Sequence, residues 1–390
     1  MTTATMKGRS TTGNIVLVVL ALLTVLALVV GIYRLSVGLG DTTNLSDDYP
    51  WGLWIGFDFT LIAFSGGAFT LAAIVYIFNL KKYRPLVRTA VLTGWLGYIS
   101  VLVILLVDLG RWDRFWAFLV YPNIHSPLYE ISLCILLYTI VLTLEFAPFV
   151  FERLNKPNIV KTIHRFTIPI VIAGVTLSML HQSTLGTLYA AMPYKLHALW
   201  HTPLLPLFFL LSSIGMGLSA VIMVTLIAGK AFGRKVEMGA LEGLAKGSVW
   251  VWVVYLLFKL EHLFFARHIA DALAFDTQSI WYLIEIIVGV ILPIVLYSMV
   301  QVRKSQAGLF WTSLLVTLGI LINRFNATWT GQSLPSSNWP IQGAVEAGTY
   351  VPHWMEIVIQ VGVLAAVTLA WYFAARYLPI FPEDVKEEAH

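Results

Sequence analysis

Charged residues and cysteine are both scarce in this sequence. Aspartate, glutamate, lysine and arginine make up 12% of the 390 residues, and the single cysteine is Cys134. One cysteine excludes a disulfide within the chain, and it also excludes an iron–sulfur cluster or a cysteine-ligated zinc site built by this chain alone. Hydrophobic residues reach 58%, and the mean hydropathy is +0.80. This composition predicts a polytopic membrane protein.

Apolar runs long enough to cross a bilayer recur along the whole chain. A window of about 20 residues finds ten of them, and no loop between them is long enough to form a soluble domain. We therefore expect an all-α integral membrane protein, with residues 1–390 as one polytopic membrane domain. The first run follows MKGR and lacks a small-residue cleavage site, so we expect an uncleaved anchor helix over 1–37. The ten predicted spans are 14–37, 55–80, 86–109, 126–150, 164–189, 202–229, 246–267, 279–300, 308–325 and 353–377.

The basic residues are distributed unevenly over the loops. With the N-terminus in the cytoplasm, 18 of the 25 lysines and arginines fall on the cytoplasmic side and five on the opposite side, while Arg34 and Lys259 lie inside spans. Because cytoplasmic loops are enriched in Lys and Arg, this count predicts that both termini are cytoplasmic. The net charge of +4 is not a sign of nucleic-acid binding, since the basic residues lie in short loops between apolar runs.

Ionisable residues cluster near the outer ends of the predicted spans. His181, in SMLHQSTLG, lies about 22 Å into a bilayer core of about 30 Å when counted from the cytoplasmic side. In the inner half, the one clear acid within a span is Glu145. Buried ionisable groups are costly unless they are paired, and in membranes they commonly mark a binding site or a proton route. The other residues in the outer third or at the outer edge are Asp58, Asp108, Glu130, Lys259, Glu261, His262, Glu285, Glu356, His125, His197, His201, His268 and His353.

For single members of this set, a structural role competes with a functional one. Asp58 fits a helix cap, and Glu130 lies one turn inside its helix, where the helix dipole favours an acid. Lys259 and Glu285 fit a buried ion pair between neighbouring helices, and His181 fits an interhelical hydrogen bond. A one-sided set drawn from six or seven helices is better explained by a function.

The histidines do not form a metal-ligand pattern, and no metal site is expected. No HxxxH pair falls inside a predicted span, and His197 and His201, in HALWH, lie in a loop between two prolines. His181 and His262 lie at comparable depth, so one haem b between them stays open as an alternative. A pair of haems across the membrane is excluded, because the inner half of the spans has no histidine to hold the second one.

The remaining residues suit the proton-coupled handling of a lipophilic molecule such as a quinone. A quinone headgroup needs hydrogen-bond partners for its two carbonyls and proton donors or acceptors nearby, and its isoprenoid tail needs an apolar slot between helices. Histidine suits the first task because its pKa lies near neutral pH, and carboxylates can pass protons on. We therefore predict catalytic roles for His181, Glu130 and Asp58, and a proton path through Glu130, Glu145 and Glu285.

The run PWGLWIGFDFTLIAFSGGAFTLA, residues 50–72, resembles the opening of the NrfD/polysulfide-reductase membrane-subunit superfamily, and most closely its HybB-type branch. The likeness covers nearly the whole chain and weakens after about residue 230. It implies two four-helix bundles over 50–325, a final helix over 353–377 and no haem. The further segments that carry the likeness are PLVRTAVLTGWLGY (85–98), PNIHSPLYE (122–130), LEFAPFVFERL (144–154), LHQSTLGTL (180–188) and YKLHALWHTPLLPLF (194–208).

The resemblance also implies a function and a location. The expected activity is electron exchange between a quinone pool, with menaquinone as the expected quinone, and a periplasmic ferredoxin-like iron–sulfur subunit. The expected catalytic partner is a periplasmic nickel–iron hydrogenase of the hydrogenase-2 type, and the expected location is the bacterial inner membrane, with the quinone site near the periplasmic face. Asp58, His125, Glu130, His181, Gln182 and His201 are site residues by motif. Lys259, Glu261 and His262 join the quinone-binding set on depth and charge.

Several alternatives remain at the level of the sequence. Similar subunits serve menaquinone reductases fed by multihaem cytochromes, alternative complex III and molybdopterin oxidoreductases. A secondary transporter is the alternative of another class, although it would need midplane polar groups at broken helices and matching features in two halves of the chain, whereas the polar groups here are off-centre. A purely structural anchor leaves the outer ionisable residues unexplained.

Overall fold

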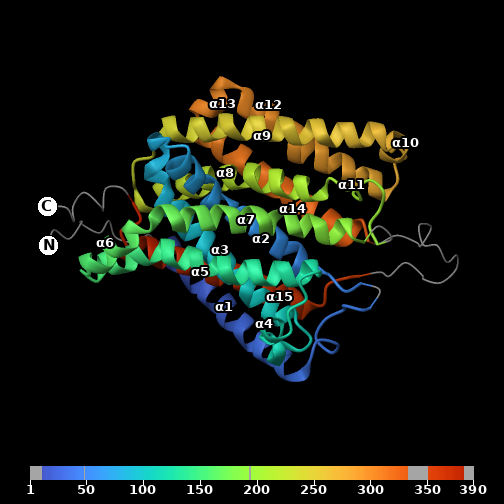
Figure 1. Cartoon of the computed structure of the whole chain (residues 1–390), viewed down its shortest axis with the longest axis horizontal. Helices are drawn as coiled ribbons and strands as arrows, with labels where there is room; N and C mark the ends of the chain where they lie inside the picture. Colours follow the sequence, from blue (N-terminus) through green and yellow to red (C-terminus); the bar gives the residue numbers. More distant parts are fainter. Residues whose placement is uncertain (1–10, 48, 193–194, 333–349, 382–390) are drawn as a thin grey trace.

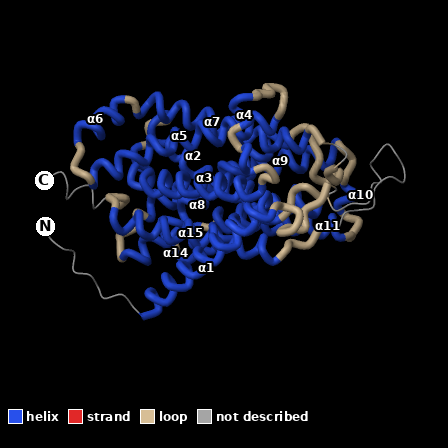
Figure 2. The backbone as a smooth tube through the Cα atoms, turned by 90° about the horizontal axis from the view of Figure 1, so that it is seen from below, coloured by secondary structure: helices blue, strands red, loops and turns tan. Residues whose placement is uncertain are grey.

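The computed structural model describes residues 11–47, 49–192, 195–332 and 350–381. Every regular element in these ranges is a helix (Figure 1, Figure 2). Ten of the helices are long and apolar enough to cross a membrane. The prediction of an all-α membrane protein with about ten spans is confirmed.

Helices lie side by side along the long axis of the molecule, with α6 at one end and α10 at the other (Figure 1). We call the end with α6 the inner end and the end with α10 the outer end. The helices are α1 (Thr11–Val37), α2 (Leu53–Ala72), α3 (Val87–Asp108), α4 (Ala117–Val120), α5 (Pro127–Arg153), α6 (Pro157–Arg165), α7 (Thr167–Ala190), α8 (Leu205–Phe232), α9 (Met238–Phe265), α10 (Ile269–Ala272), α11 (Thr277–Ile286), α12 (Leu292–Ser298), α13 (Val300–Lys304), α14 (Gln306–Phe325) and α15 (Trp354–Tyr377), with 3₁₀ turns at Lys81–Leu86 and Trp112–Arg114.

Local sequence explains where several helices begin and end. Pro127 occupies the first turn of α5, where a missing backbone N–H costs nothing. Gly233, with φ +65°, ends α8 in the left-handed conformation that favours glycine. Asp276 and Ser305 cap α11 and α14 by accepting backbone N–H groups. The bond from the Ser279 N–H also holds the pKa of Asp276 below its usual range.

Three spans contain a π-helical turn, in which one extra residue widens the helix. The turns are Ala73–Ile77 after α2, Ile287–Ile291 between α11 and α12, and Asn326–Thr330 after α14. The last one carries the ninth span to Thr330, five residues beyond its predicted end at 325. The extension is polar, which is why hydropathy alone ends the span early.

Eight of the spans pack into two groups of four. Helices α2, α3, α5 and α7 form the first bundle, and α8, α9, α11–α12 and α14 form the second. The bundles meet where α2 packs on α8: a Cβ on Gly66 would lie 2.8 Å from the Ser213 carbonyl oxygen, and one on Gly67 the same distance from that of Gly217. Small residues here let the two backbones approach closely, as is common between membrane helices.

The first and last helices flank the first bundle. α1 packs along α15, and α15 also contacts α3. A Cβ on Gly362 would lie 2.7 Å from the Leu23 carbonyl oxygen, while Val30, further along α1, shares an apolar cluster with Ile359. The two helices are therefore antiparallel, so α1 begins at the end of the molecule where α15 finishes. The terminal segments 1–10 and 382–390 lie outside the described residues, and which end faces the cytoplasm stays a prediction.

Candidate functional site

Five of the predicted site residues lie in two separate clusters in the outer half: Glu130, His181 and Gln182 in one, and Lys259 and Glu285 in the other. We call Tyr98, Glu130, His181, Gln182 and Thr184 the first-bundle cluster. The second-bundle cluster consists of Trp200, Lys259, Glu285, Asn323, Arg324 and Asn326. Aromatic rings of Phe59, Tyr189 and Phe209 pack between the bundles.

His181 is the centre of the first-bundle cluster. The α7 segment places its ring wholly inside the bundle, with no exposed surface. Nδ1 lies 2.9 Å from the Tyr98 hydroxyl on α3. Nε2 is buried and has no hydrogen-bond partner among the described residues. Since nearly all buried polar atoms in proteins are paired, an unpaired imidazole nitrogen calls for a ligand or water.

Two other predicted site residues, Gln182 and Asp58, also carry unpaired buried atoms. Gln182 Nε2 donates to the Ile62 carbonyl oxygen at 3.0 Å, but its Oε1 has no partner within the described chain. Asp58 lies one turn before Ile62 on α2, is 1% exposed, and neither of its carboxylate oxygens has a partner there. Gly52 occupies the cap position of α2, so the interpretation of Asp58 as a helix cap is wrong.

Glu130 on α5 is hydrogen-bonded to a side chain of α7. It is the fourth residue of α5, which places it one turn inside the helix as predicted. Its Oε1 accepts from the Thr184 hydroxyl at 2.8 Å. Thr184 follows His181 by three residues and so lies on the same face of α7. Glu130 thus reaches the vicinity of His181 through Thr184.

A line of buried polar side chains runs inward from His181. The Tyr98 ring packs edge-on against Tyr138, with centroids 4.7 Å apart, and the fully buried Ser178 lies beside both phenols. Glu145 is two turns further along α5 than Tyr138. A Cβ on Gly174 would lie 3.6 Å from both Glu145 Oε1 and Tyr138 Cε2. Two phenols and a hydroxyl thus lie between the inner acid and the outer histidine, although the Tyr138 hydroxyl and Ser178 Oγ have no hydrogen-bond partner among the described residues.

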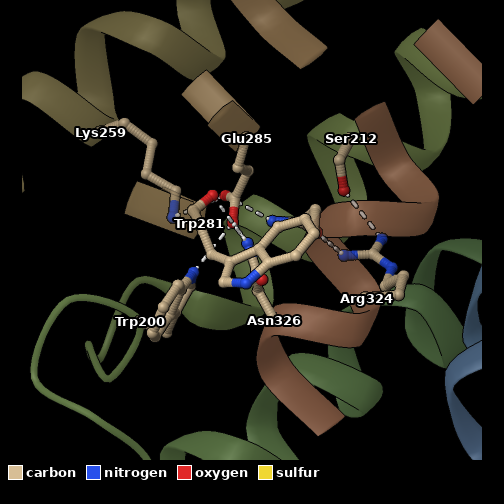
Figure 3. A network of polar contacts seen from close by, with 8 residues as sticks. Trp200, Ser212, Lys259, Trp281, Glu285, Arg324 and Asn326 are labelled. Atoms are coloured by element: carbon tan, nitrogen blue, oxygen red, sulfur yellow. Dashed lines mark hydrogen bonds and ion pairs between the residues drawn. The ribbon is translucent and has the colours of Figure 1, made fainter. Parts of the chain in front are cut away.

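The second-bundle cluster is built around Glu285 (Figure 3). Its carboxylate is 1% exposed and accepts hydrogen bonds from Trp200 Nε1 at 2.8 Å, Asn323 Nδ2 at 2.7 Å and Asn326 Nδ2 at 2.9 Å. Lys259 Nζ lies 3.6 Å from the same carboxylate. The Lys259 ammonium also stacks on the rings of Phe208, Tyr282 and Tyr255.

Arg324 adds a second buried cation to this cluster. Its guanidinium donates to Ser212 Oγ at 2.8 Å (Figure 3) and to Asn323 Oδ1 at 2.7 Å. It also lies 3.9 Å from the centre of the Phe209 ring. Lys259 pairs with Glu285 directly, whereas Arg324 is linked to the same carboxylate through the Asn323 side chain. Charges removed from water are tolerated only with such compensating bonds. The fully bonded carboxylate favours the structural ion pair over a proton-path role for Glu285.

Besides Asp58 and Glu145, four predicted residues lie outside both clusters. His125 is exposed in the loop before α5, and Glu261 is exposed on α9. His201 Nε2 lies 3.2 Å from the Ala190 carbonyl oxygen at the outer end of α7. The His262 ring lies beside His268, with centroids 6.0 Å apart. These positions line the outer end of the molecule and do not complete the His181 site.

Metal ligation finds no support in the described residues, among which no three His, Cys, Asp or Glu side chains are placed to hold an ion. In HALWH, His197 Nδ1 accepts from the Leu199 backbone N–H at 3.2 Å. Burial lowers the pKa of the His197 imidazole, and the nearby Asp276 carboxylate raises it to a lesser degree. The ring is therefore a neutral, locally bonded group of the outer loop.

Sequence reasoning names Asp108 and Glu356 but misses that they lie near Arg34 in a third polar group, between α1, α3 and α15. Arg34, fully buried, donates to the Leu109 carbonyl oxygen at 2.9 Å and lies within electrostatic reach of Asp108. Glu356 accepts from the Asn44 N–H and the Tyr350 hydroxyl. Arg34 interrupts an apolar run and was noted only as lying inside a span, because nothing in the sequence names its partner. Arg324 was likewise counted with the outer loops and is instead buried.

The family can now be stated from the comparison with known sequences. The model of the polysulphide reductase NrfD family matches residues 41–335, about three quarters of the chain. The chain belongs to the NrfD family. The match covers all of both polar clusters, and the predicted resemblance to this family is confirmed.

Named relatives of this NrfD protein are membrane subunits of oxidoreductases. The probable Ni/Fe-hydrogenase 2 b-type cytochrome subunit of Escherichia coli is 32% identical over 375 residues, 94% of this chain and 92% of the relative. The menaquinone reductase integral membrane subunit of Nitratidesulfovibrio vulgaris is 29% identical over 386 residues, covering 91% and 88%. A selenate reductase subunit of Mesobacillus selenatarsenatis is 25% identical over 404 residues, covering 93% of each. The NrfD chain is thus similar to redox-complex subunits over nearly its full length.

Proposed function

We propose that this NrfD protein is the quinone-reactive membrane subunit of a respiratory oxidoreductase complex. It passes electrons between an iron–sulfur subunit on the periplasmic side and the menaquinone pool, and it is active only within the complex. The observation that carries the proposal is the set of unpaired buried atoms on His181, Gln182 and Asp58, side chains that are each at most 1% exposed. They lie in the outer half of the first bundle, which the positive-inside count assigns to the periplasmic side of the bacterial inner membrane.

These atoms suit both redox forms of a quinone headgroup. An oxidised quinone carries carbonyl oxygens that only accept hydrogen bonds, whereas the reduced form carries hydroxyls that also donate. With the Tyr98 hydroxyl donating to Nδ1, the neutral His181 ring carries its proton on Nε2 and can donate to a carbonyl. Gln182 Oε1 and Asp58 offer acceptors for a hydroxyl. The side chains are sealed from water, so a headgroup reaches them between helices from the bilayer.

The relatives support this assignment and indicate which catalytic partner subunit is favoured. The hydrogenase-2 relative of Escherichia coli favours a nickel–iron hydrogenase as the periplasmic catalytic partner. The menaquinone reductase relative favours menaquinone as the quinone. It also supports the second candidate, a complex that is fed by multihaem cytochromes or that resembles alternative complex III. Since one cysteine holds no iron–sulfur cluster, the electrons come from another subunit.

We propose no haem for this chain, although the hydrogenase relative is called a b-type cytochrome subunit. A haem b needs two axial ligands on opposite faces of the iron. The two histidines of comparable depth belong to different bundles: His181 packs against Tyr98 within the first, and the His262 ring lies beside His268 at the outer end of the second.

Protons reach the site, in our proposal, along the line from Glu145 through Tyr138, Ser178 and Tyr98 to His181. His181 gives its Nε2 proton to the substrate oxygen as Nδ1 takes the proton of the Tyr98 hydroxyl, and a proton from Glu145 then restores Tyr98. Glu130, bonded to Thr184, serves the same site from the outer side. Uptake through Glu145 brings protons from the cytoplasm while the electrons arrive from the periplasm, which makes the reaction electrogenic.

Purification of the tagged chain in mild detergent tests the function. We expect mass spectrometry to identify an iron–sulfur subunit and a catalytic redox partner in the same complex, and we expect that complex to reduce or oxidise a soluble menaquinone analogue. The identity of the catalytic partner distinguishes a hydrogenase from a cytochrome-fed reductase. A chain that purifies without any redox protein would contradict the proposal and favour transport.

Replacing Glu145 by glutamine tests the source of the protons. In proteoliposomes containing the whole complex, we expect Glu145→Gln to lower the membrane potential generated per electron and to slow turnover about tenfold, because a protonatable group leaves the path. Glu237→Gln, an exposed acid at the same inner end, is the matched control and should behave as wild type. An unchanged potential in the Glu145 variant would show that protons enter from the outside.

A further inference from the structure

A cavity of about 650 Å³ lies at the inner end of the first bundle, between α2, α3, α5 and α7. Its volume falls in the range of pockets that hold small-molecule ligands. Ala72, Val91, Phe149 and Val171 give it buried apolar walls. The site proposed for the quinone lies in the outer half of the same bundle, and the cavity shares with that proposal only Glu145, the start of the proton path, which lies in its wall.

The rim of the cavity carries an excess of positive charge. Lys81 and Arg84, in the turn before α3, are exposed, and neither side chain forms a hydrogen bond or ion pair with the described residues. Arg88, also at the cavity, forms two bonds of 2.6 and 2.8 Å with the Glu152 carboxylate. That pair is neutral as a unit, so Lys81 and Arg84 supply the surplus charge.

The neighbouring helix α6 places this rim at the level of lipid headgroups. Ile159 and Ile163 lie one turn apart on one face of α6, and Lys161 and Arg165 lie one turn apart on the other. A short basic amphipathic helix of this kind lies in the membrane interface with its apolar face towards the acyl chains. Ile163 also lines the cavity, which joins the interfacial helix to the apolar walls.

We propose that the cavity binds an anionic phospholipid of the cytoplasmic leaflet. Its phosphate is held between Lys81 and Arg84, and an acyl chain follows the apolar walls. Basic pockets between helices on the cytoplasmic side are suited to anionic headgroups. Glu145 does not oppose the phosphate, because it lies seven residues, about 10 Å along α5, deeper than Glu152. A free phosphate ion would meet the same cations but would leave the apolar walls unused.

Lipid titration of the purified whole chain tests the proposal. Short-chain phosphatidylglycerol, short-chain phosphatidylcholine and inorganic phosphate are each added to delipidated protein, and binding is followed by the rise in unfolding temperature and by native mass spectrometry. We expect phosphatidylglycerol alone to bind with a clear stabilisation. Lys81→Gln and Arg84→Gln should each weaken its binding about fivefold, and the double variant about thirtyfold.

Lys304→Gln is the matched control, since Lys304 is an exposed base at the inner end of the second bundle; it should leave phosphatidylglycerol binding unchanged. Equal stabilisation by inorganic phosphate would overturn the lipid assignment in favour of a soluble anion. Equal binding of phosphatidylcholine, or unchanged binding in the double variant, would overturn recognition of the anion by this rim.

Discussion

Replacing His181 by alanine is expected to lower quinone turnover about 100-fold or more in a complex that still assembles. The reason is that general acid–base groups typically contribute factors of about 100 to 10,000 to a rate, and the unpaired Nε2 of His181 is the donor proposed for the substrate oxygen. Turnover is measured with a soluble menaquinone analogue on the purified complex. The ratio of the partner proteins to this chain, determined on the same sample, shows whether assembly is intact.

Two companion variants separate a chemical role of His181 from a structural one. Ser183→Ala changes a half-buried residue of the same helix, whose hydroxyl donates only to backbone carbonyls of α7, and should retain full turnover. Tyr98→Phe keeps the ring that packs on Tyr138 but removes the hydroxyl 2.9 Å from Nδ1, so we expect a loss of about tenfold from slower reprotonation. Near wild-type turnover in an assembled His181→Ala complex would show that His181 has only a structural role, as a hydrogen-bond link between helices.

Glu285→Ala is expected to destabilise the protein by about 3–5 kcal/mol, the usual cost of removing one partner of a buried ion pair. The variant leaves Lys259 and Arg324 without a nearby buried anion. It also leaves the donor groups of Trp200 and Asn323 unpaired and removes one of the two acceptors of Asn326 Nδ2. Thermal unfolding of the purified chain in a fixed detergent measures the loss. Glu261→Ala, an exposed acid near the outer end of α9, is the control and should unfold as wild type.

A double-mutant cycle tests whether Lys259 and Glu285 depend on each other. Lys259→Met and Glu285→Leu each break the pair, but together they replace it with apolar side chains, so the double variant should lose less stability than the sum of the two single losses. Strictly additive losses would mean that the 3.6 Å pair contributes no coupling. In that case the hydrogen bonds to Trp200, Asn323 and Asn326 alone hold the carboxylate.

Hydropathy was sufficient to predict the membrane spans, because a 20-residue apolar run has few alternatives to crossing a bilayer. It was insufficient where polar residues continue a helix. Asn326–Thr330 extends the ninth span because a π-helical turn keeps the backbone bonded while the Asn326 side chain reaches Glu285. That extension depends on a tertiary contact, which no window over the sequence contains.

The sequence was sufficient to pick out the buried ionisable residues of the candidate site, but not to predict which side chains they contact. His181 and Glu285 stand out because an ionisable group inside an apolar run is energetically costly unless it is paired or has a function. Tyr98 and Thr184 do not stand out, since tyrosine and threonine are ordinary in membrane helices, and only the rotation of α3 and α7 in the bundle brings them to His181 and Glu130. The sequence also could not reveal that Lys259 and His181 lie in different bundles.

The π-helical turn Ile287–Ile291 changes the direction in which the side chains that follow it in the eighth span point around the helix axis. Glu285 and Tyr297 are twelve positions apart, and at about 100° per residue a regular helix would point them about 120° away from each other. The turn absorbs one residue, which leaves them about 20° apart. Both are buried: Glu285 bonds Trp200, and the Tyr297 hydroxyl lies 2.7 Å from Ser313 Oγ. A regular α-helix over the same twelve positions could therefore seat the acid or the phenol in the core, but not both, and the π-helical turn is what lets this length of chain bury the two together.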